Sequence, residues 1–121
     1  MGYCSEVSVV MTRNLFAEMF QQIPDQVTEL IRYADRFESL DNCILLYWDS
    51  IKWYEDTSPI RQFMNVLGEA EESEYYFIEL GEDCSDNKER GDFYDNPFYT
   101  CMVRRISIDA SGKPVELNAF M

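Results

Sequence analysis

The chain has 121 residues, with 23 Asp or Glu, 10 Lys or Arg and no His, which gives a formal net charge of −13. Its 46% apolar and 15% aromatic residues exclude a disordered acidic chain, which would be poor in aromatic residues. The acidic excess argues against direct nucleic-acid binding, because phosphate contacts come mainly from Lys and Arg. We therefore expect one folded acidic domain, residues 1–121.

The first third of the chain predicts one strand and two helices. Residues 3–12 are rich in valine, which favours a buried strand, and Thr12 or Asn14 can cap the helix that follows. That helix should stop near Pro24, where a second helix begins. Its apolar stripe runs through Val27, Leu30, Ile31, Ala34 and Phe37, and residues 38–42 then read as a polar turn.

The middle of the chain alternates strand and helix. Residues 43–48 are apolar at every position, which predicts a strand covered on both faces. Ser58 as cap and Pro59 at the first position predict a helix that ends at Gly68. Residues 75–80 are aromatic and β-branched, which predicts another strand.

The last third predicts a long polar loop between Gly81 and Pro97 and a strand over residues 99–108. A short edge strand can follow at residues 114–117, where proline is tolerated. The order β-α-α-β-α-β-β predicts an α+β fold with a mainly antiparallel four- to five-stranded sheet and about three helices on one face. Ferredoxin-like connectivity is the nearest familiar arrangement.

Chemistry and location are constrained mainly by what the sequence lacks. Without His, triads built on that residue are excluded, and no pair of carboxylates has a spacing that selects it, so we expect no catalytic residues and no cofactor. The oxygen-rich loop at residues 82–92 does not match the calcium-loop pattern, so we expect no metal site. A carboxylate-based enzyme or a divalent-metal binder remains an alternative.

Targeting signals are not evident. No apolar run approaches the ~20 residues that span a bilayer, and the first residues lack a signal pattern. The cysteines are far apart, and Cys43 and Cys101 lie in apolar strand-like runs where a thiol behaves as a small buried hydrophobe. We expect reduced cysteines, a cytoplasmic protein and no membrane partner.

The acidic run from Glu69 to Asp95 is the candidate binding surface. It holds eleven Asp or Glu against Lys88 and Arg90, and a predicted strand within it would fix carboxylates on a rigid scaffold. The carboxylates that we expect to contact a partner are Glu69, Glu71, Glu72, Glu74, Glu82, Asp83, Asp86, Glu89, Asp92 and Asp95. Trp53 and Tyr94 are the candidate aromatic anchors, although the edge of the core is the favoured place for Trp53. Glu79 is left out, because we expect it to pair with Arg104 or Arg105 across neighbouring strands.

A compact acidic domain with no catalytic signature and abundant aromatic residues resembles the small phage-encoded inhibitors of bacterial immunity, especially anti-CRISPR proteins. The resemblance is one of type and covers the whole chain, with the acidic run and Asp49, Glu55 and Asp109 as candidate contacts. It implies an inhibitor, in the cytoplasm of the host cell, that binds a basic surface of a Cas effector and blocks target DNA or PAM engagement. The alternative is a small regulatory or assembly module whose acidity serves solubility. The sequence leaves a monomer or a homodimer open.

Overall fold

The fold is built on an antiparallel sheet, which a computed structural model describes for residues 4–81, 87–102 and 105–121. The α-helices in this part of the chain are α1 (Arg13–Gln22), α2 (Pro24–Arg32) and α3 (Ile60–Glu69), and two 3₁₀ helices are η1 (Glu72–Glu74) and η2 (Leu117–Phe120). The strands are β1 (Ser5–Thr12), β2 (Arg36–Leu40), β3 (Cys43–Ile51), β4 (Tyr75–Gly81), β5 (Asn87–Gly91), β6 (Cys101–Met102), β7 (Ile106–Ser107) and β8 (Lys113–Pro114).

The main sheet has six strands in the order β5-β4-β1-β3-β2-β8, and each neighbouring pair is antiparallel. β6 and β7 form a separate antiparallel pair. The prediction of an α+β fold with an antiparallel sheet is confirmed, but the strand count and order differ from it. The central part of the sheet, β4-β1-β3-β2, agrees with the expected ferredoxin-like connectivity, because β1 and β2 run parallel with β3 between them as in a split β-α-β unit; β5 and β8 are added at the edges.

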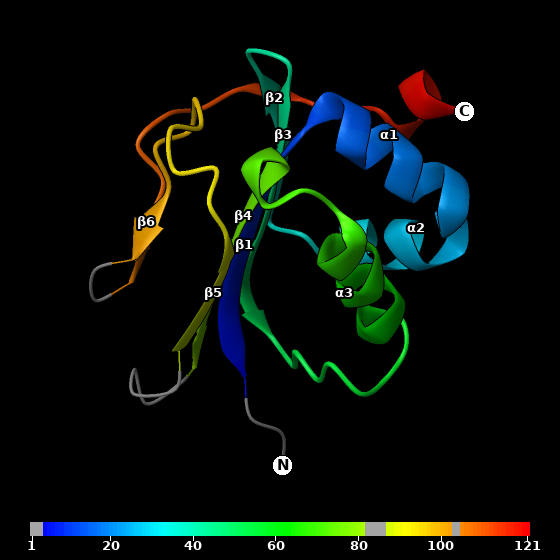
Figure 1. The fold of residues 1–121 in the computed structure, drawn as a ribbon, viewed down its shortest axis with the longest axis horizontal. Helices are drawn as coiled ribbons and strands as arrows, with labels where there is room; N and C mark the ends of the chain where they lie inside the picture. The colour runs from blue at the N-terminus through cyan, green and yellow to red at the C-terminus, as the bar shows by residue number, and fades with distance from the viewer. Residues whose placement is uncertain (1–3, 82–86, 103–104) are drawn as a thin grey trace.

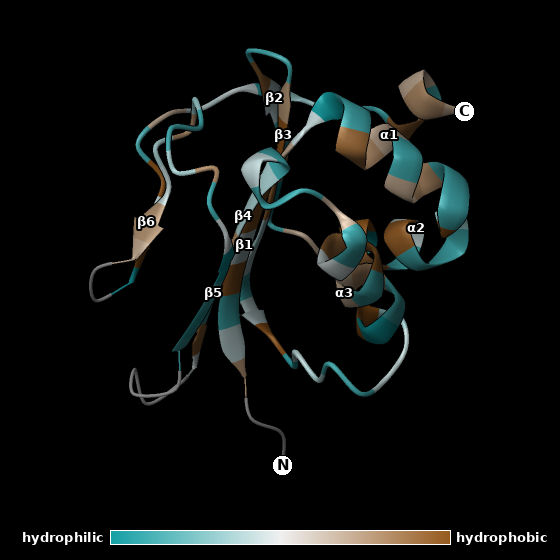
Figure 2. Cartoon of the chain, viewed as in Figure 1, coloured by the Kyte–Doolittle hydropathy of each residue, from teal (hydrophilic) through white to brown (hydrophobic). Residues whose placement is uncertain are grey.

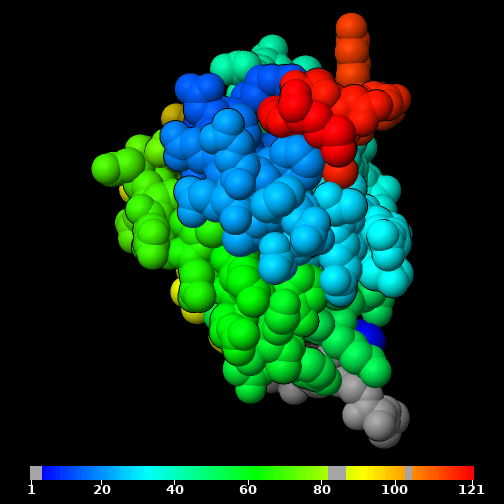
Figure 3. Space-filling view, turned by 90° about the vertical axis from the view of Figure 1, so that its right-hand side faces the viewer, coloured from blue at the N-terminus to red at the C-terminus, as the bar shows by residue number. Residues whose placement is uncertain are grey.

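The three α-helices cover one face of the sheet, as predicted (Figure 1). Alternate residues of β1, Val7, Val9 and Met11, join the core beneath the helices, together with Phe16 of α1 and Phe63 of α3. The helices and the C-terminal residues form a continuous layer on this side (Figure 3). The sheet therefore has one thoroughly buried face.

The opposite face is covered by β6, β7 and the segment that leads to them (Figure 1). Asn96 is fully buried and organises this segment, since its side chain donates to the Phe93 carbonyl and the Thr100 hydroxyl and accepts from the Phe98 backbone N–H. Phe98 is thereby held against Leu45 of β3. The prediction that residues 43–48 form a strand covered on both faces is confirmed.

The helix ends agree only partly with the sequence signals. Thr12 caps α1, because its hydroxyl accepts a hydrogen bond from the Leu15 backbone N–H at 3.2 Å. Ser58 does not cap α3, which begins at Ile60 after Pro59 and has no side-chain cap. Gly68 does not end that helix either, since the backbone becomes extended only at Ala70.

The second strand was not predicted. Phe37 continues the apolar stripe of α2 in the sequence, but it lies in β2 and packs against Phe16 with ring centroids 5.5 Å apart. Asp41 and Asn42, with φ of 49° and 64°, form the two-residue turn between β2 and β3. Positive φ at both positions is typical of tight hairpins, because the turn then matches the twist of the strands.

The C-terminal third also differs from the prediction. The expected loop at residues 81–97 contains β5, a strand of hydrophilic residues along the edge of the sheet (Figure 2). The expected single strand over residues 99–108 is wrong, because Tyr99 has a φ of 54° and the short strands β6 and β7 pair with each other. The short edge strand is confirmed as β8, although it is shifted to Lys113–Pro114.

The described cysteines, Cys4, Cys43 and Cys101, are free thiols. Cys43 is buried as expected, whereas Cys101 is exposed because β6 lies on the outside of the sheet. None of the helices in the described residues is long and apolar enough to cross a membrane.

Candidate functional site

The described carboxylates of the predicted site gather where α3, η1 and β5 meet. η1 lies against β5, and the Asp92 backbone N–H donates to the Glu72 carbonyl at 2.8 Å. Six of these side chains are exposed, and the seventh, Glu74, is half-buried and accepts a hydrogen bond from the Thr12 hydroxyl at 3.3 Å. We call this surface the acidic edge, and it consists of Glu69, Glu71, Glu72, Glu74, Glu89, Asp92 and Asp95.

The acidic edge keeps its negative charge. Among the described residues, none of its seven carboxylates forms an ion pair with Lys or Arg. The two nearby cations are directed elsewhere: Arg90 pairs with Glu55 at 3.1 Å, and Lys88 lies 3.9 Å from the same carboxylate. Both cations of β5 thus contact Glu55, which lies outside the acidic edge and neutralises one of their two charges.

Two acidic contacts implied by the resemblance do not remain free. Glu55 is paired with Arg90 and Lys88, and Asp49 accepts from Arg105 at 2.9 Å. A carboxylate with a cation of its own chain offers little net charge to a partner. Asp109 is exposed and accepts from the Ser107 hydroxyl at 3.2 Å.

The remaining predicted site residues have different outcomes. Glu82, Asp83 and Asp86 lie outside the described residues. Trp53 cannot serve as an anchor, because it is only 4% exposed and its ring packs on Trp48, Phe63 and Phe77 at 5.3 to 5.9 Å. Burial of so large an apolar surface in the helix-side core explains why the indole does not reach the exterior.

Tyr94 is exposed to solvent, and its ring packs on the ring of a buried tyrosine. It is 62% exposed, and its ring meets that of Tyr76 edge to face with centroids 5.0 Å apart. The Tyr76 hydroxyl donates to Glu89, and burial together with this hydrogen bond raises the pKa of Tyr76 well above its usual value. Tyr76 therefore remains a neutral donor that orients the Glu89 carboxylate.

An open hollow of about 490 Å³ lies within the acidic edge. Its lining residues come from the end of α3, from η1, from β4 and β5, and from the segment after β5. They are Gly68, Glu72, Tyr75, Glu89, Arg90, Gly91 and Tyr94. Burial and the negative charge of Glu72 raise the pKa of Tyr75. We call this feature the edge hollow.

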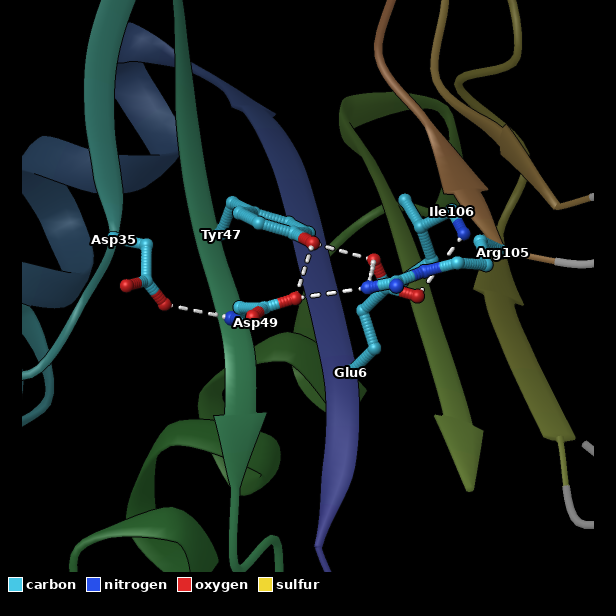
Figure 4. Close-up of polar contacts among 6 residues, drawn as sticks. All are labelled: Glu6, Asp35, Tyr47, Asp49, Arg105 and Ile106. Carbon is cyan, nitrogen blue, oxygen red and sulfur yellow. Dashed lines mark hydrogen bonds and ion pairs between the residues drawn. The ribbon is translucent and has the colours of Figure 1, made fainter. Parts of the chain in front are cut away.

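A second polar cluster lies on the opposite face of the sheet and was not predicted (Figure 4). Glu6 of β1 is only 7% exposed. One of its oxygens accepts from the Ile106 backbone N–H at 3.1 Å, and the other accepts from the Tyr47 hydroxyl and from Arg105 at 3.3 Å. Tyr47 and Arg105 also reach Asp49. Both carboxylate oxygens of Glu6 are thus engaged in holding β7 on the sheet.

This cluster tests one half of the prediction that Arg104 or Arg105 pairs with Glu79. Arg105 pairs with Glu6 and Asp49 rather than with Glu79, and Arg104 lies outside the described residues. The sequence signal was a glutamate on an otherwise apolar strand, because a buried carboxylate requires donors from elsewhere in the chain. Its particular donors could not be known before the path of the C-terminal third was known.

In the described part of the chain, no three Cys, Asp or Glu side chains are grouped so that they could hold a metal ion. Comparison with protein-family models, with curated proteins and with solved structures found no match. The acidic edge and its hollow are therefore the features from which a function can be inferred.

Proposed function

We propose that this protein is a non-enzymatic binding domain whose acidic edge occupies a basic, nucleic-acid-binding surface of a partner protein. The observation that carries the proposal is the set of seven carboxylates of the acidic edge, none of which forms an ion pair with a Lys or Arg in the part of the chain that the structure describes. A stable domain normally disperses or pairs such charges, since like charges held close together repel one another. A cationic partner would relieve that repulsion.

The scaffold holds part of the acidic edge on hydrogen-bonded backbone. β5 is hydrogen-bonded to β4, and η1 is fixed by the backbone contact between Asp92 and Glu72, so these carboxylates are attached to ordered backbone. Duplex DNA presents closely spaced negative charges, one per ~1.7 Å of helix axis. A folded edge with clustered carboxylates can therefore compete for the arginines and lysines of a DNA channel.

The most concrete partner that we propose is a Cas effector, in the manner of a phage anti-CRISPR inhibitor. Effectors hold guide and target in positively charged channels and read the PAM with Arg or Lys, so an acidic competitor would block target DNA or PAM engagement. No catalytic step by the inhibitor is needed, because occupation of the channel is sufficient.

The test is a DNA-binding competition with a panel of purified, guide-loaded Cas effectors. The chain should raise the apparent Kd of the matching effector for target DNA, and the effect should weaken with salt because exposed charges are screened beyond about 10 Å at 0.1 M ionic strength. An edge triple variant, Glu69→Lys, Glu71→Lys and Asp92→Lys, should lose this effect. These three side chains are exposed and do not line the edge hollow.

A control triple variant has the same change in net charge. Glu18→Lys, Glu29→Lys and Glu116→Lys alter exposed carboxylates away from the acidic edge and should leave the competition intact. If both triple variants lose the effect equally, only net charge matters and the proposal of a specific surface is wrong. If no effector responds, the Cas assignment is wrong.

A further inference from the structure

The C-terminal residues 110–121 pass the edge of the sheet that lies opposite to β5, form β8 there and end as η2 beside α1 (Figure 1). We propose that this segment, the C-terminal strap, opens and closes as one unit while β5, β4, β1, β3 and β2 stay paired. In the open state the rings of Phe16 and Phe37 are uncovered. This inference does not rest on the proposed function, because it concerns the other edge of the sheet.

An ion pair on β2 holds the beginning of the strap. Arg36 and Glu38 pair with each other at 2.7 Å. The Arg36 guanidinium also donates to the Ala110 carbonyl at 3.1 Å, and the Glu38 carboxylate accepts from the Gly112 backbone N–H at 2.9 Å. Both ends of this short turn are therefore attached through one pair of side chains, which we call the clasp.

Aromatic packing holds the end of the strap on the other face of β2. Phe37 lies between the two clasp residues in the strand, so its ring points to the helix side, where it packs on Phe16. Phe120 meets Phe16 edge to face with ring centroids 4.8 Å apart, and the Arg13 guanidinium lies 4.5 Å from the centre of the Phe120 ring. The strap thus contacts β2 and its neighbours from both faces of the sheet, and its last residues lie over α1 (Figure 3).

The strap buries little surface compared with the strands. Every residue from 110 to 121 is at least partly exposed, whereas β1 and β4 are buried along nearly their whole length. Beyond the clasp, β8 pairs with β2 over two residues, and the Val115 N–H donates to the Phe37 carbonyl at 3.1 Å. Segments with few buried contacts open at a much smaller free energy than the whole fold does. β2 itself pairs with β3 over five residues, and this pairing does not depend on the strap.

The two attachments should act together. The strap backbone lies directly on β2 at Gly112, where an added Cβ would be 2.2 Å from the Ser39 carbonyl oxygen. While the clasp is closed, it keeps Phe120 close to Phe16, and while these rings are packed, they keep the turn close to the clasp. Two contacts on one short chain raise each other's effective concentration, so the loss of one weakens the other. Opening should therefore be cooperative rather than a gradual fraying of the last residues.

The experiment is native-state hydrogen exchange of the ¹⁵N-labelled chain, measured by NMR at low urea concentrations. The amides of Gly112 and Val115 report on the strap, because their acceptors lie on β2. Both should exchange through the same opening, with equal opening free energies and a weak dependence on urea, since little surface is exposed. The amides of β1 and β4 should be better protected, and their exchange should depend steeply on urea.

Variants at the two attachments test whether the strap is one unit. Phe120→Ala should accelerate exchange of the Gly112 and Val115 amides by the same factor, about tenfold, although both amides donate to residues of β2. Glu38→Gln should accelerate exchange of the Val115 amide several-fold, although Glu38 is not its acceptor. Asn118→Ala is the matched control, because it changes an exposed residue of η2, and it should leave both rates unchanged.

A variant outside the strap tests whether the opening is separate from global unfolding. Ile78→Val shortens a fully buried side chain on the face of the sheet away from the helices, so the amides of β1 and β4 should exchange about two- to tenfold faster. The Gly112 and Val115 amides should keep their rates, because Ile78 stays packed whether the strap is closed or open.

Three results would overturn the proposal. Equal acceleration of the strap amides and the sheet amides in Ile78→Val would show that the strap opens only when the whole domain unfolds. Acceleration of Val115 without Gly112 in Phe120→Ala, or an equal effect of Asn118→Ala, would show simple fraying of the chain end. Exchange of both strap amides at the rate of an unfolded peptide would show that the strap is not held closed.

Discussion

Replacing Glu6 by alanine should destabilise the protein far more than replacing an exposed glutamate. Glu6 is 7% exposed and accepts three hydrogen bonds, one of them from the Ile106 backbone N–H. In Glu6→Ala this N–H loses its acceptor while Ile106 remains 8% exposed, and an orphaned buried donor costs about 1–3 kcal/mol. The Tyr47 hydroxyl retains Asp49 at 3.3 Å, so its loss is about 1 kcal/mol.

The burial of a charge offsets part of this loss. A buried carboxylate carries a desolvation penalty that disappears with the side chain, so we expect a net decrease in the free energy of unfolding of about 2–3 kcal/mol. Glu6→Gln should cost clearly less, because the amide oxygen can still accept from Ile106. Glu116→Ala, at an exposed position, should lie within about 0.5 kcal/mol of the unmodified protein.

Two measurements check this prediction. Urea unfolding followed by tryptophan fluorescence gives the change in the free energy of unfolding, provided that the m value is unchanged. Hydrogen exchange of the Ile106 amide gives the local effect, and it should accelerate in Glu6→Ala more than the amides of β1 and β4 do. If Glu6→Ala is as stable as Glu116→Ala, or if the Ile106 amide exchanges at its original rate, Glu6 does not hold β7 on the sheet.

Three further predictions follow from individual residues. Gly91 has a φ of 80°, and an added Cβ would lie 2.1 Å from a carbonyl oxygen of β4, so Gly91→Ala should lower the midpoint of urea unfolding, whereas Gly68→Ala, in open space on α3, should raise stability by about 0.5–1 kcal/mol. Burial and hydrogen bonds to carboxylates raise the pKa of Tyr47 and Tyr76, so stabilisation by the protonated phenols is complete below their usual pKa of about 10 and is lost only at higher pH. In an ultraviolet titration, the absorbance change near pH ~10 comes from tyrosines with an ordinary pKa, so Tyr47→Phe or Tyr76→Phe should leave it unchanged. A smaller absorbance change near pH ~10 in either variant would contradict the raised pKa of that tyrosine. The hydrogen bond from its arginine partner lowers the pKa of Glu38, so its stabilisation is present above the usual glutamate pKa and is lost as pH falls through the folded value. Denaturation should show Glu38→Gln less stable by about 1 kcal/mol at neutral pH, and the difference should shrink as pH falls below the usual glutamate pKa of about 4.3 and vanish only below the lowered pKa of the folded protein. A difference of the same size in strong acid would rule this out.

The apolar elements of the fold could be predicted from sequence, because their patterns are dictated by burial. β1, β3 and β4 are buried along most of their length, and their valines, isoleucines and aromatic residues indicated strands. β5 could not be found in this way, since none of its residues is apolar and its pairing with β4 depends on tertiary position. β2 was obscured because Phe37 fits a helical stripe as well as it fits a strand.

The candidate site was predictable in composition but not in detail. The acidic run indicated where carboxylates would gather, because charge excess is read directly from sequence. The edge hollow could not be predicted, since it needs Gly68, Glu72 and Tyr94 from separate elements to face one another. The sequence left Trp53 open between the edge of the core and a contact surface, because an indole can serve as either, and only its packing against Phe63 and Phe77 decides between them.

The position of β1 between β3 and β4 has a consequence for how the molecule is made. During synthesis β1 emerges first, but its two neighbours are completed only at Ile51 and Gly81. Until Gly81 has been added, the β4 side of β1 has no strand to hydrogen-bond with, and the valines of β1 are incompletely buried. Exposed apolar residues and an unpaired strand edge are the conditions under which nascent chains aggregate or recruit chaperones. Folding should therefore be slow for a domain of this size, since long loops must close first, and a fragment that stops before Gly81 should be insoluble.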